Sequence, residues 1–298
     1  MDPKVANDPV SEEMAPRRIG SPEAGAAPEI PPAVPSSSKA SARAKSVCII
    51  SYTSLGCRTS FIIGLKVSSL EVPASTMTSE QFRRLLGRIH AEVPDESARL
   101  LERLRRQRRA PLLKVLMQTI LSHQTTSTQT RRAIDRLWAR YHTLERVADA
   151  RPAEIKRLVD NVGLGQIKAR RLVAMAVDIR GRWGGEQRLA RYLRSAPLEE
   201  ARRVLMDLPG VGPKTAAVVL LFRFHRPTFP VDTNILRVAR ELGWVRRNAD
   251  PEDVRNLVER TLPRDPALLL KAHAYLIALG RATQRGRRRD LLDRLRLT

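Results

Sequence analysis

One lysine stands where its side chain could carry out covalent chemistry. Lys214 lies in the segment LPGVGPKTA, residues 208–216, just after two glycines and a proline. A neutral lysine amine can attack an electrophilic carbon and form a Schiff base, whereas arginine stays protonated. The first turn of a helix favours the neutral form, because the positive end of the helix dipole disfavours an ammonium there. On spacing alone, a simpler role stays open, in which Lys214 only contacts a phosphate.

The same segment has the composition of a tight turn between two helices. An apolar helical stripe ends near Leu208, two glycines follow two residues apart, and Pro213 suits the first turn of the next helix. The first N–H groups of that helix have no partner within it, so the turn can bind a phosphate through its backbone. An ordinary helix connection would also contain two such glycines, but the whole string between two helices is more specific.

Further polar residues stand at the ends of expected helices or within them. Asp232, in VDTNILRV at 231–238, precedes an apolar stripe, and spacing alone favours a plain N-cap. Gln124, in LSHQTT at 121–126, lies on an expected loop and offers both a donor and an acceptor, although loop polarity alone would also explain it. His273 stands among apolar residues, so we expect a hydrogen-bonded core histidine.

Helices must position these residues, because the pattern after Met77 is helical throughout. Apolar residues recur at spacings of three and four, for example over 155–162, 198–208 and 254–262. The segment DPED at 250–253 has the order of an N-cap, a first-turn proline and first-turn acids. No credible strand appears in this part, so we predict an all-α fold of about ten helices.

Positive charge is concentrated in the same part of the chain. The 298 residues include 54 Lys or Arg and 31 Asp or Glu, a formal net charge of +23. Residues 77–298 hold 46 basic and 24 acidic residues, a net charge of +22. Such a surplus favours polyanions, nucleic acid first and an anionic membrane surface second. The apolar fraction of 42% excludes a wholly disordered chain, and no stretch is apolar for long enough to form a membrane helix.

Residues 1–76 differ from the rest. Residues 1–46 are rich in Pro, Ala, Ser and Glu, which predicts disorder, and they lack the pattern of a signal peptide. Two explanations stay open: a disordered extension, or a mis-annotated start with translation beginning at Met77. Both cysteines, Cys48 and Cys57, lie in this part, so residues 77–298 can hold neither a disulfide nor a cysteine-ligated iron–sulfur cluster.

Taken together, the motifs resemble the endonuclease III branch of the helix–hairpin–helix DNA glycosylases over about residues 80–283. They are similar, in the family's order, to its first DNA-contacting loop (121–126), a further turn (163–169), the helix–hairpin–helix motif (208–216), the aspartate motif (231–238) and the helix before the cluster loop (273–281). The resemblance implies two all-α subdomains that flank a DNA-binding cleft. A central bundle would span about 105–226, and 77–104 with 227–298 would form the second subdomain.

The resemblance also implies a role for each matching residue. Lys214 would be the catalytic lysine that forms a Schiff base with the sugar, and Asp232 would stabilise positive charge on that sugar and assist proton transfer. Gln124 would enter the space left by a flipped-out base. The hairpin would contact DNA through Leu208, Gly210, Val211, Gly212 and Thr215.

We therefore predict a monomeric DNA glycosylase and AP lyase that acts on damaged bases in double-stranded DNA. We expect no cofactor, no metal and no membrane contact, and a cytoplasmic, nucleoid-associated protein if the source is prokaryotic. The chain departs from the family at two positions. Gln284 stands where the first of four cluster cysteines is expected, and Ser127 replaces an acidic residue beside the damage pocket, which puts the usual oxidised pyrimidine substrates in doubt.

Two alternatives stay open at this point. One is a non-catalytic helix–hairpin–helix protein that only binds DNA, and the other is a glycosylase of the same fold for alkylated or mismatched bases. The pair of Lys214 and Asp232 separates the first alternative from an enzyme, because binding alone does not require both side chains. The identity of the base depends on the shape of the pocket, which the sequence does not specify.

Overall fold

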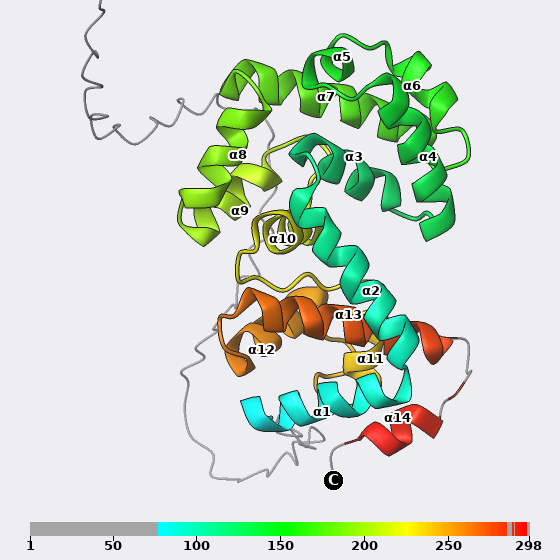
Figure 1. Ribbon diagram of the computed structural model, residues 1–298, viewed down its shortest axis with the longest axis vertical. Coiled ribbons are helices and arrows are strands. Elements are labelled where there is room, and N and C mark those ends of the chain that lie inside the picture. The colour runs from blue at the N-terminus through cyan, green and yellow to red at the C-terminus, as the bar shows by residue number, and fades with distance from the viewer. Residues whose placement is uncertain (1–76, 285–287, 289, 297–298) are drawn as a thin grey trace, which may run out of the picture. The chain divides into compact units, whose positions relative to one another are not determined.

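The computed structural model describes residues 77–284, 288 and 290–296 (Figure 1). Every regular element in these residues is helical, which confirms the predicted all-α fold. The hypotheses for residues 1–76 lie outside the described residues. None of the described helices has the length and apolar character needed to cross a bilayer.

Eight helices enclose a first hydrophobic core. They are α3 (Leu112–Ser122), α4 (Ser127–Arg140), α5 (Leu144–Ala148), α6 (Pro152–Leu158), α7 (Gly165–Trp183), α8 (Glu186–Ser195), α9 (Leu198–Met206) and α10 (Pro213–Val218). Helix α3 is apolar around most of its circumference and buries eight of its 11 residues. Helix α7 is the longest, and its buried stripe includes Leu172, Met175 and Ala176. The apolar stripes seen in the sequence at 155–162 and 198–208 therefore face one shared interior.

Six helices enclose a second core, which combines both ends of the described chain. They are α1 (Ser79–Glu92), α2 (Pro94–Arg106), α11 (Thr233–Glu241), α12 (Pro251–Thr261), α13 (Pro266–Ala282) and α14 (Asp290–Leu295). Helix α13 lies at the centre of this group, with 11 of its 17 residues buried, and it packs against α1, α2 and α11. A helix buried on nearly all sides must be largely apolar, and the buried segment 272–280 contains only apolar residues and glycine apart from His273 and Tyr275.

Helix α10 and the π-helical turn that follows it, Val219–Arg223, contribute to both cores. Val219 and Leu220 belong to the first core, whereas Val218 and Phe222 belong to the second. The hairpin that begins α10 therefore lies where the two sets of helices meet. Lys214, on the first turn of α10, is positioned by packing on both sides of its helix.

The described residues contain fourteen α-helices, so the expectation of about ten was wrong. Two of the additional helices, α5 and α14, have only five and six residues, and a helical period cannot be recognised over fewer than two turns. The predicted start at 250–253 is confirmed. Asp250 is the N-cap of α12, and its carboxylate accepts the N–H groups of Glu252 at 2.8 Å and Asp253 at 3.0 Å.

Gly280 in α13 sets how closely α11 can approach. A Cβ atom at Gly280 would lie 2.6 Å from the Cβ of Asn234, in the first turn of α11. We expect Gly280→Ala to lower the free energy of unfolding by about 2 kcal/mol through overpacking, measured by urea denaturation. Gly181→Ala in α7 is the matched control, because no atom lies within 4 Å of its Cβ position. There alanine should raise the free energy of unfolding by up to about 1 kcal/mol; equal effects at both sites would contradict a close α11–α13 contact.

Candidate active site

The turn between α9 and α10 needs glycine at its tip. Gly210 has a φ of +84°, a region that residues with a side chain rarely adopt. A Cβ atom there would also lie 3.0 Å from Cδ of Arg171, which belongs to α7. The absence of a side chain therefore lets the hairpin rest directly on α7.

Three N–H groups at this turn are available to an anion. Those of Gly212, Lys214 and Thr215 precede the first intrahelical hydrogen bond of α10. The Val211 N–H differs, because it donates to the Leu208 carbonyl oxygen at 3.0 Å and closes the turn. The side chains of Leu208, Val211 and Thr215 are buried, so the DNA contacts predicted for these three residues would have to come from backbone atoms.

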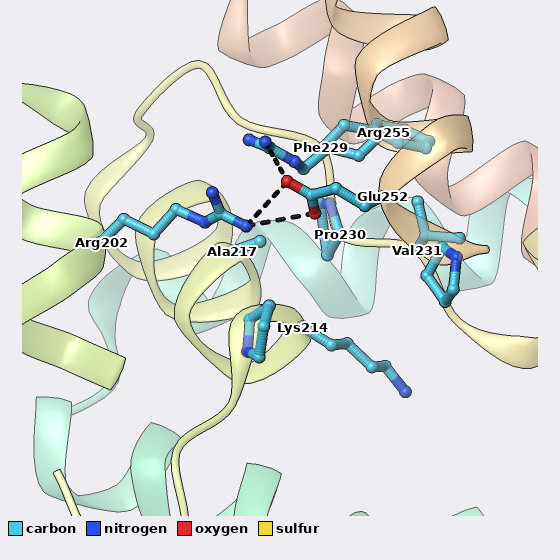
Figure 2. A pocket seen from close by; sticks show the side chains of 10 residues that line it. Arg202, Lys214, Ala217, Phe229, Pro230, Val231, Glu252 and Arg255 are labelled. Carbon is cyan, nitrogen blue, oxygen red and sulfur yellow. Dashed lines mark hydrogen bonds and ion pairs between the residues drawn. The ribbon is translucent and has the colours of Figure 1, made fainter. Parts of the chain in front are cut away.

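The Lys214 side chain is exposed, and no described residue holds its amine by a hydrogen bond or an ion pair. Figure 2 shows this side chain extending away from a neighbouring cluster of Arg202, Glu252 and Arg255. In the cluster, the Glu252 carboxylate accepts from Arg202 at 3.2 Å and from Arg255. Glu252 is therefore already paired, and the Lys214 amine stays available to a ligand.

Asp232 is the N-cap of α11. Its Oδ1 atom accepts the Ile235 N–H at 2.8 Å, and its Oδ2 atom accepts the side-chain amide of Asn234 at 3.2 Å. The carboxylate is half-buried, and within the described residues no cation pairs with it. The predicted cap is confirmed, while the catalytic role of Asp232 stays a prediction.

His273 links Lys214 and Asp232 electrostatically. Its Nδ1–H donates to the Pro230 carbonyl oxygen at 2.8 Å in the second core, which confirms the predicted core histidine. Burial lowers the pKa of His273 to about 4, while the charge of Asp232 raises this pKa and that of Lys214 lowers it further. Both side chains therefore lie close enough to His273 to act on its charge, from the two helix starts that carry them.

The buried neutral His273 should make the stability of the fold depend on pH. Its pKa is about 4 in the folded protein and 6.5 ordinarily, so the unfolded chain binds more protons between these two values. We expect full stability above about pH 6.5 and a loss of about 3 kcal/mol as the pH falls toward 4. Urea denaturation at several pH values checks this. The His273→Leu variant should have a lower free energy of unfolding at pH 7, but this free energy should change less between pH 6.5 and 4. An equally steep change in the variant would contradict the assignment of this pH dependence to His273.

The loop between α3 and α4 lies against the hairpin. His123 Nε2 is 3.2 Å from the Thr215 hydroxyl. Burial, followed by the charge of Lys214, lowers the pKa of His123, which keeps this ring neutral at pH 7. Gln124 is exposed and has a φ of +50°, an uncommon conformation for a residue with a side chain. The structure thus brings the loop of Gln124 beside the turn of Lys214.

Leu164 joins this surface, although the sequence analysis did not single it out. It is 54% exposed, has a φ of +61° and immediately precedes α7. A Cβ atom at Gly163 would lie 3.5 Å from the Gln124 carbonyl oxygen, so the two turns lie side by side. An apolar residue between Gly163 and Gly165 was the available signal, because a leucine in a tight turn has little chance of burial.

The residues present do not fit a cysteine-ligated cluster. Gln284 follows α13 and is exposed, and both cysteines precede Met77 in the sequence. Across the part of the chain that the structure describes, no three His, Cys, Asp or Glu side chains gather as a metal site.

Ser127, the first residue of α4, lies beside an arginine. The Arg281 guanidinium donates to the Ser127 hydroxyl at 3.4 Å and to Glu96 at 2.8 Å. Burial, followed by the charges of Arg281 and Arg131, lowers the pKa of Arg103. A hydroxyl and a guanidinium thus occupy the position where the resemblance leads one to expect an acid.

The chain is similar to known proteins of base excision DNA repair. Residues 117–264 match the family model described as HhH-GPD superfamily base excision DNA repair protein. The chain is 32% identical to endonuclease III of Rickettsia conorii over 176 residues, which cover 59% of this chain and 77% of the relative. It is also 32% identical to endonuclease III of Thermotoga maritima over 152 residues, which cover 51% of this chain and 66% of that protein.

A solved structure shows the same fold. The trapped endonuclease III–DNA covalent intermediate, an estranged-adenine complex, matches with a TM-score of 0.56 and 25% identity. The match covers 68% of this chain and 86% of that one. The chain therefore belongs to the HhH-GPD superfamily of base excision DNA repair proteins, among the endonuclease III-like DNA glycosylases.

Proposed function

We propose that this protein removes damaged bases from double-stranded DNA and then cleaves the strand as an AP lyase. The observation that carries the proposal is the exposed, unpaired Lys214 amine, which lines a pocket together with Pro230 and Val231, the residues directly before the Asp232 carboxylate. A protein that only bound DNA would need the helix cap that Asp232 provides but not its negative charge, because asparagine caps equally well and DNA is itself an anion. The solved endonuclease III complex is a trapped covalent intermediate, which supports the same route.

In the proposed reaction, Lys214 attacks C1′ of a nucleotide whose base has left the duplex stack. A bond forms between Nζ and C1′ as the bond from C1′ to the base breaks, and the base leaves with a proton. The amine then loses a proton, and the sugar ring opens to a Schiff base between Nζ and C1′. Loss of a proton from C2′ breaks the bond from C3′ to its phosphate oxygen. Asp232 stabilises the positive charge that develops on the sugar and accepts protons.

The hairpin would hold the DNA backbone for this step. A phosphate at the first turn of α10 could accept the N–H groups of Gly212, Lys214 and Thr215, without using the Lys214 side chain. The net charge of +22 over residues 77–298 would attract the rest of the duplex. Backbone contacts at the hairpin would leave the amine free for chemistry.

Gln124 and Leu164 would fill the gap that the flipped nucleotide leaves. Both are exposed, both have a positive φ, and their turns lie side by side. Apolar side chains that enter a base step separate the neighbouring bases, and a side-chain amide can pair with the orphaned base. We assign Leu164 as the wedge and Gln124 as the partner of the orphaned base.

A glycosylase for alkylated or mismatched bases is the second candidate, favoured by one observation. Ser127 places a hydroxyl beside Arg281 where an acidic residue would otherwise stand. A hydroxyl and a guanidinium donate hydrogen bonds, whereas a carboxylate only accepts them, so the two arrangements would bind different groups on the edge of a base. The fold and the hairpin suit either choice of base.

Borohydride trapping on a panel of duplexes tests the proposal. Each duplex would carry one lesion: an oxidised pyrimidine, 8-oxoguanine, an alkylated purine, a G·T or G·U mismatch, or an abasic site. Borohydride reduces a Schiff base to a stable protein–DNA adduct, so an adduct on the abasic duplex supports the lyase, and the base lesions that give adducts define the specificity. A protein that binds all these duplexes but gives no adduct and releases no base would be a binding protein.

A further inference from the structure

Lys168 is buried, which is unusual for a lysine. It lies in the first turn of α7, and its side chain is only 2% exposed. Burying a charge is costly unless hydrogen bonds replace its water. No acidic side chain among the described residues forms an ion pair with Lys168. Its environment has to stabilise the ammonium through neutral groups.

Those groups belong to the last turn of α3 and to the loop after it, which carries Gln124. Lys168 Nζ donates to the Leu121 carbonyl oxygen at 3.0 Å, to the His123 carbonyl oxygen, and to the Thr125 hydroxyl oxygen at 2.7 Å. The Thr125 hydroxyl already donates its hydrogen to the His123 carbonyl at 3.1 Å, so it must accept from Nζ. Three donated bonds require the ammonium form, because a neutral amine has only two hydrogens.

The loop follows directly on the C-terminal end of α3. Leu121 is one of the last residues of that helix, where the carbonyl groups lack intrahelical partners and the helix dipole is negative. An ammonium is the best donor for such carbonyls, and it compensates in part for the burial that lowers the pKa of Lys168. The three bonds flank Gln124 on both sides, and Gln124 has the strained φ of +50°.

The backbone of Lys168 holds the second turn. Its N–H donates to the Leu164 carbonyl oxygen at 3.0 Å, at the start of α7. One residue therefore binds the turn of Leu164 through its main chain and the loop of Gln124 through its side chain. The contact between Gly163 and the Gln124 carbonyl shows that the two turns also touch directly.

We infer that Lys168 is a positioning residue that fixes Gln124 and Leu164 relative to each other, so that the two enter the DNA stack as one unit. The inference rests on the proposed function, in which these two side chains replace the flipped nucleotide. Lys168 itself does not touch the reacting atoms. Its loss should therefore impair distortion of the duplex much more than the chemistry of Lys214.

The test compares Lys168→Met with Lys156→Met. Methionine keeps an unbranched apolar side chain but donates no hydrogen bond, and Lys156 is an exposed lysine nearby on α6. The first measurement is the single-turnover rate of borohydride trapping at an abasic site in duplex DNA, divided by the rate in single-stranded DNA, where no stack must be opened. We expect Lys168→Met to lower this ratio about tenfold or more, as misplaced positioning groups do. Lys156→Met should leave the ratio within about twofold, as expected of an exposed residue.

The second measurement does not depend on catalysis. A duplex with a tetrahydrofuran abasic analogue opposite 2-aminopurine fluoresces more strongly when the orphaned base is unstacked. The unaltered protein should raise this fluorescence on binding, and Lys168→Met should still bind, by anisotropy, but raise it less than half as much. Equal fluorescence and an equal trapping ratio in a folded Lys168→Met protein would overturn the inference while leaving the proposed function intact. Failure of the unaltered protein to trap either abasic strand would instead contradict the proposed lyase.

If Lys168→Met does not fold, as judged by circular dichroism, Thr125→Val takes its place. This variant removes one acceptor of Lys168 and the Thr125 bond to the His123 carbonyl, and Thr125 is only half-buried. The same two measurements should change in the same direction by a smaller factor, and an unchanged ratio in this variant overturns the inference.

Discussion

Replacing Lys214 with glutamine should reduce borohydride trapping and base release at least about 10³-fold, the effect of removing a covalent nucleophile. Duplex affinity should fall by less than about fivefold, since the N–H groups of the hairpin remain and one surface charge contributes little. Lys214→Arg should fail equally, because its guanidinium stays protonated. Gel analysis of trapped adducts and anisotropy with duplex DNA give the two readouts.

Lys271→Gln is the matched control for this change. Lys271 is also an exposed lysine in the first turns of a helix, α13, but it lies over the Tyr275 ring rather than at the hairpin. The Lys271→Gln variant should form the trapped adduct at a rate within about twofold of the unaltered protein, because a surface substitution usually has a small effect. An undiminished adduct in Lys214→Gln would show that another amine is the nucleophile.

Asp232→Asn should lower the rate of base release about 10²-fold or more at unchanged fold stability. Asparagine is as good an N-cap as aspartate, and its side-chain oxygen can still accept the Ile235 N–H. It carries no negative charge, so it cannot stabilise a cationic sugar or accept a proton. Single-turnover base release gives the rate, and urea denaturation gives the stability.

Asp250→Asn provides the same chemical change at a second N-cap. Asp250 is exposed and caps α12, where its carboxylate accepts the N–H group three residues on, as that of Asp232 does in α11. The two variants should have similar free energies of unfolding, while only Asp232→Asn loses activity. Equal losses of activity in both variants would mean that Asp232 acts only as a helix cap. Full activity of Asp232→Asn would show that the Asp232 carboxylate takes no part in the reaction.

The sequence by itself determined the features that depend on neighbours along the chain. The helical period predicted the all-α class, and the glycines with Pro213 predicted the hairpin between α9 and α10. The caps at Asp232 and Asp250 also followed from local rules, because an N-cap bonds only to the next two or three residues. The short helices α5 and α14 escaped prediction, since they offer too few residues for a helical period.

Only the tertiary structure decided which of these local features meet. The Lys168 side chain reaches the loop of Gln124 across 43 to 47 positions of sequence, and His123 meets Thr215 across 92. The sequence alone does not show whether a lysine in a helix is buried or exposed, because the residue is the same in both cases. Leu164 was missed because its exposure depends on how the α7 turn packs beside the α3 loop. Pairings of this kind depend on the packing of the two cores, which hold distant segments in one place and thereby bring Lys214, Asp232 and His273 together.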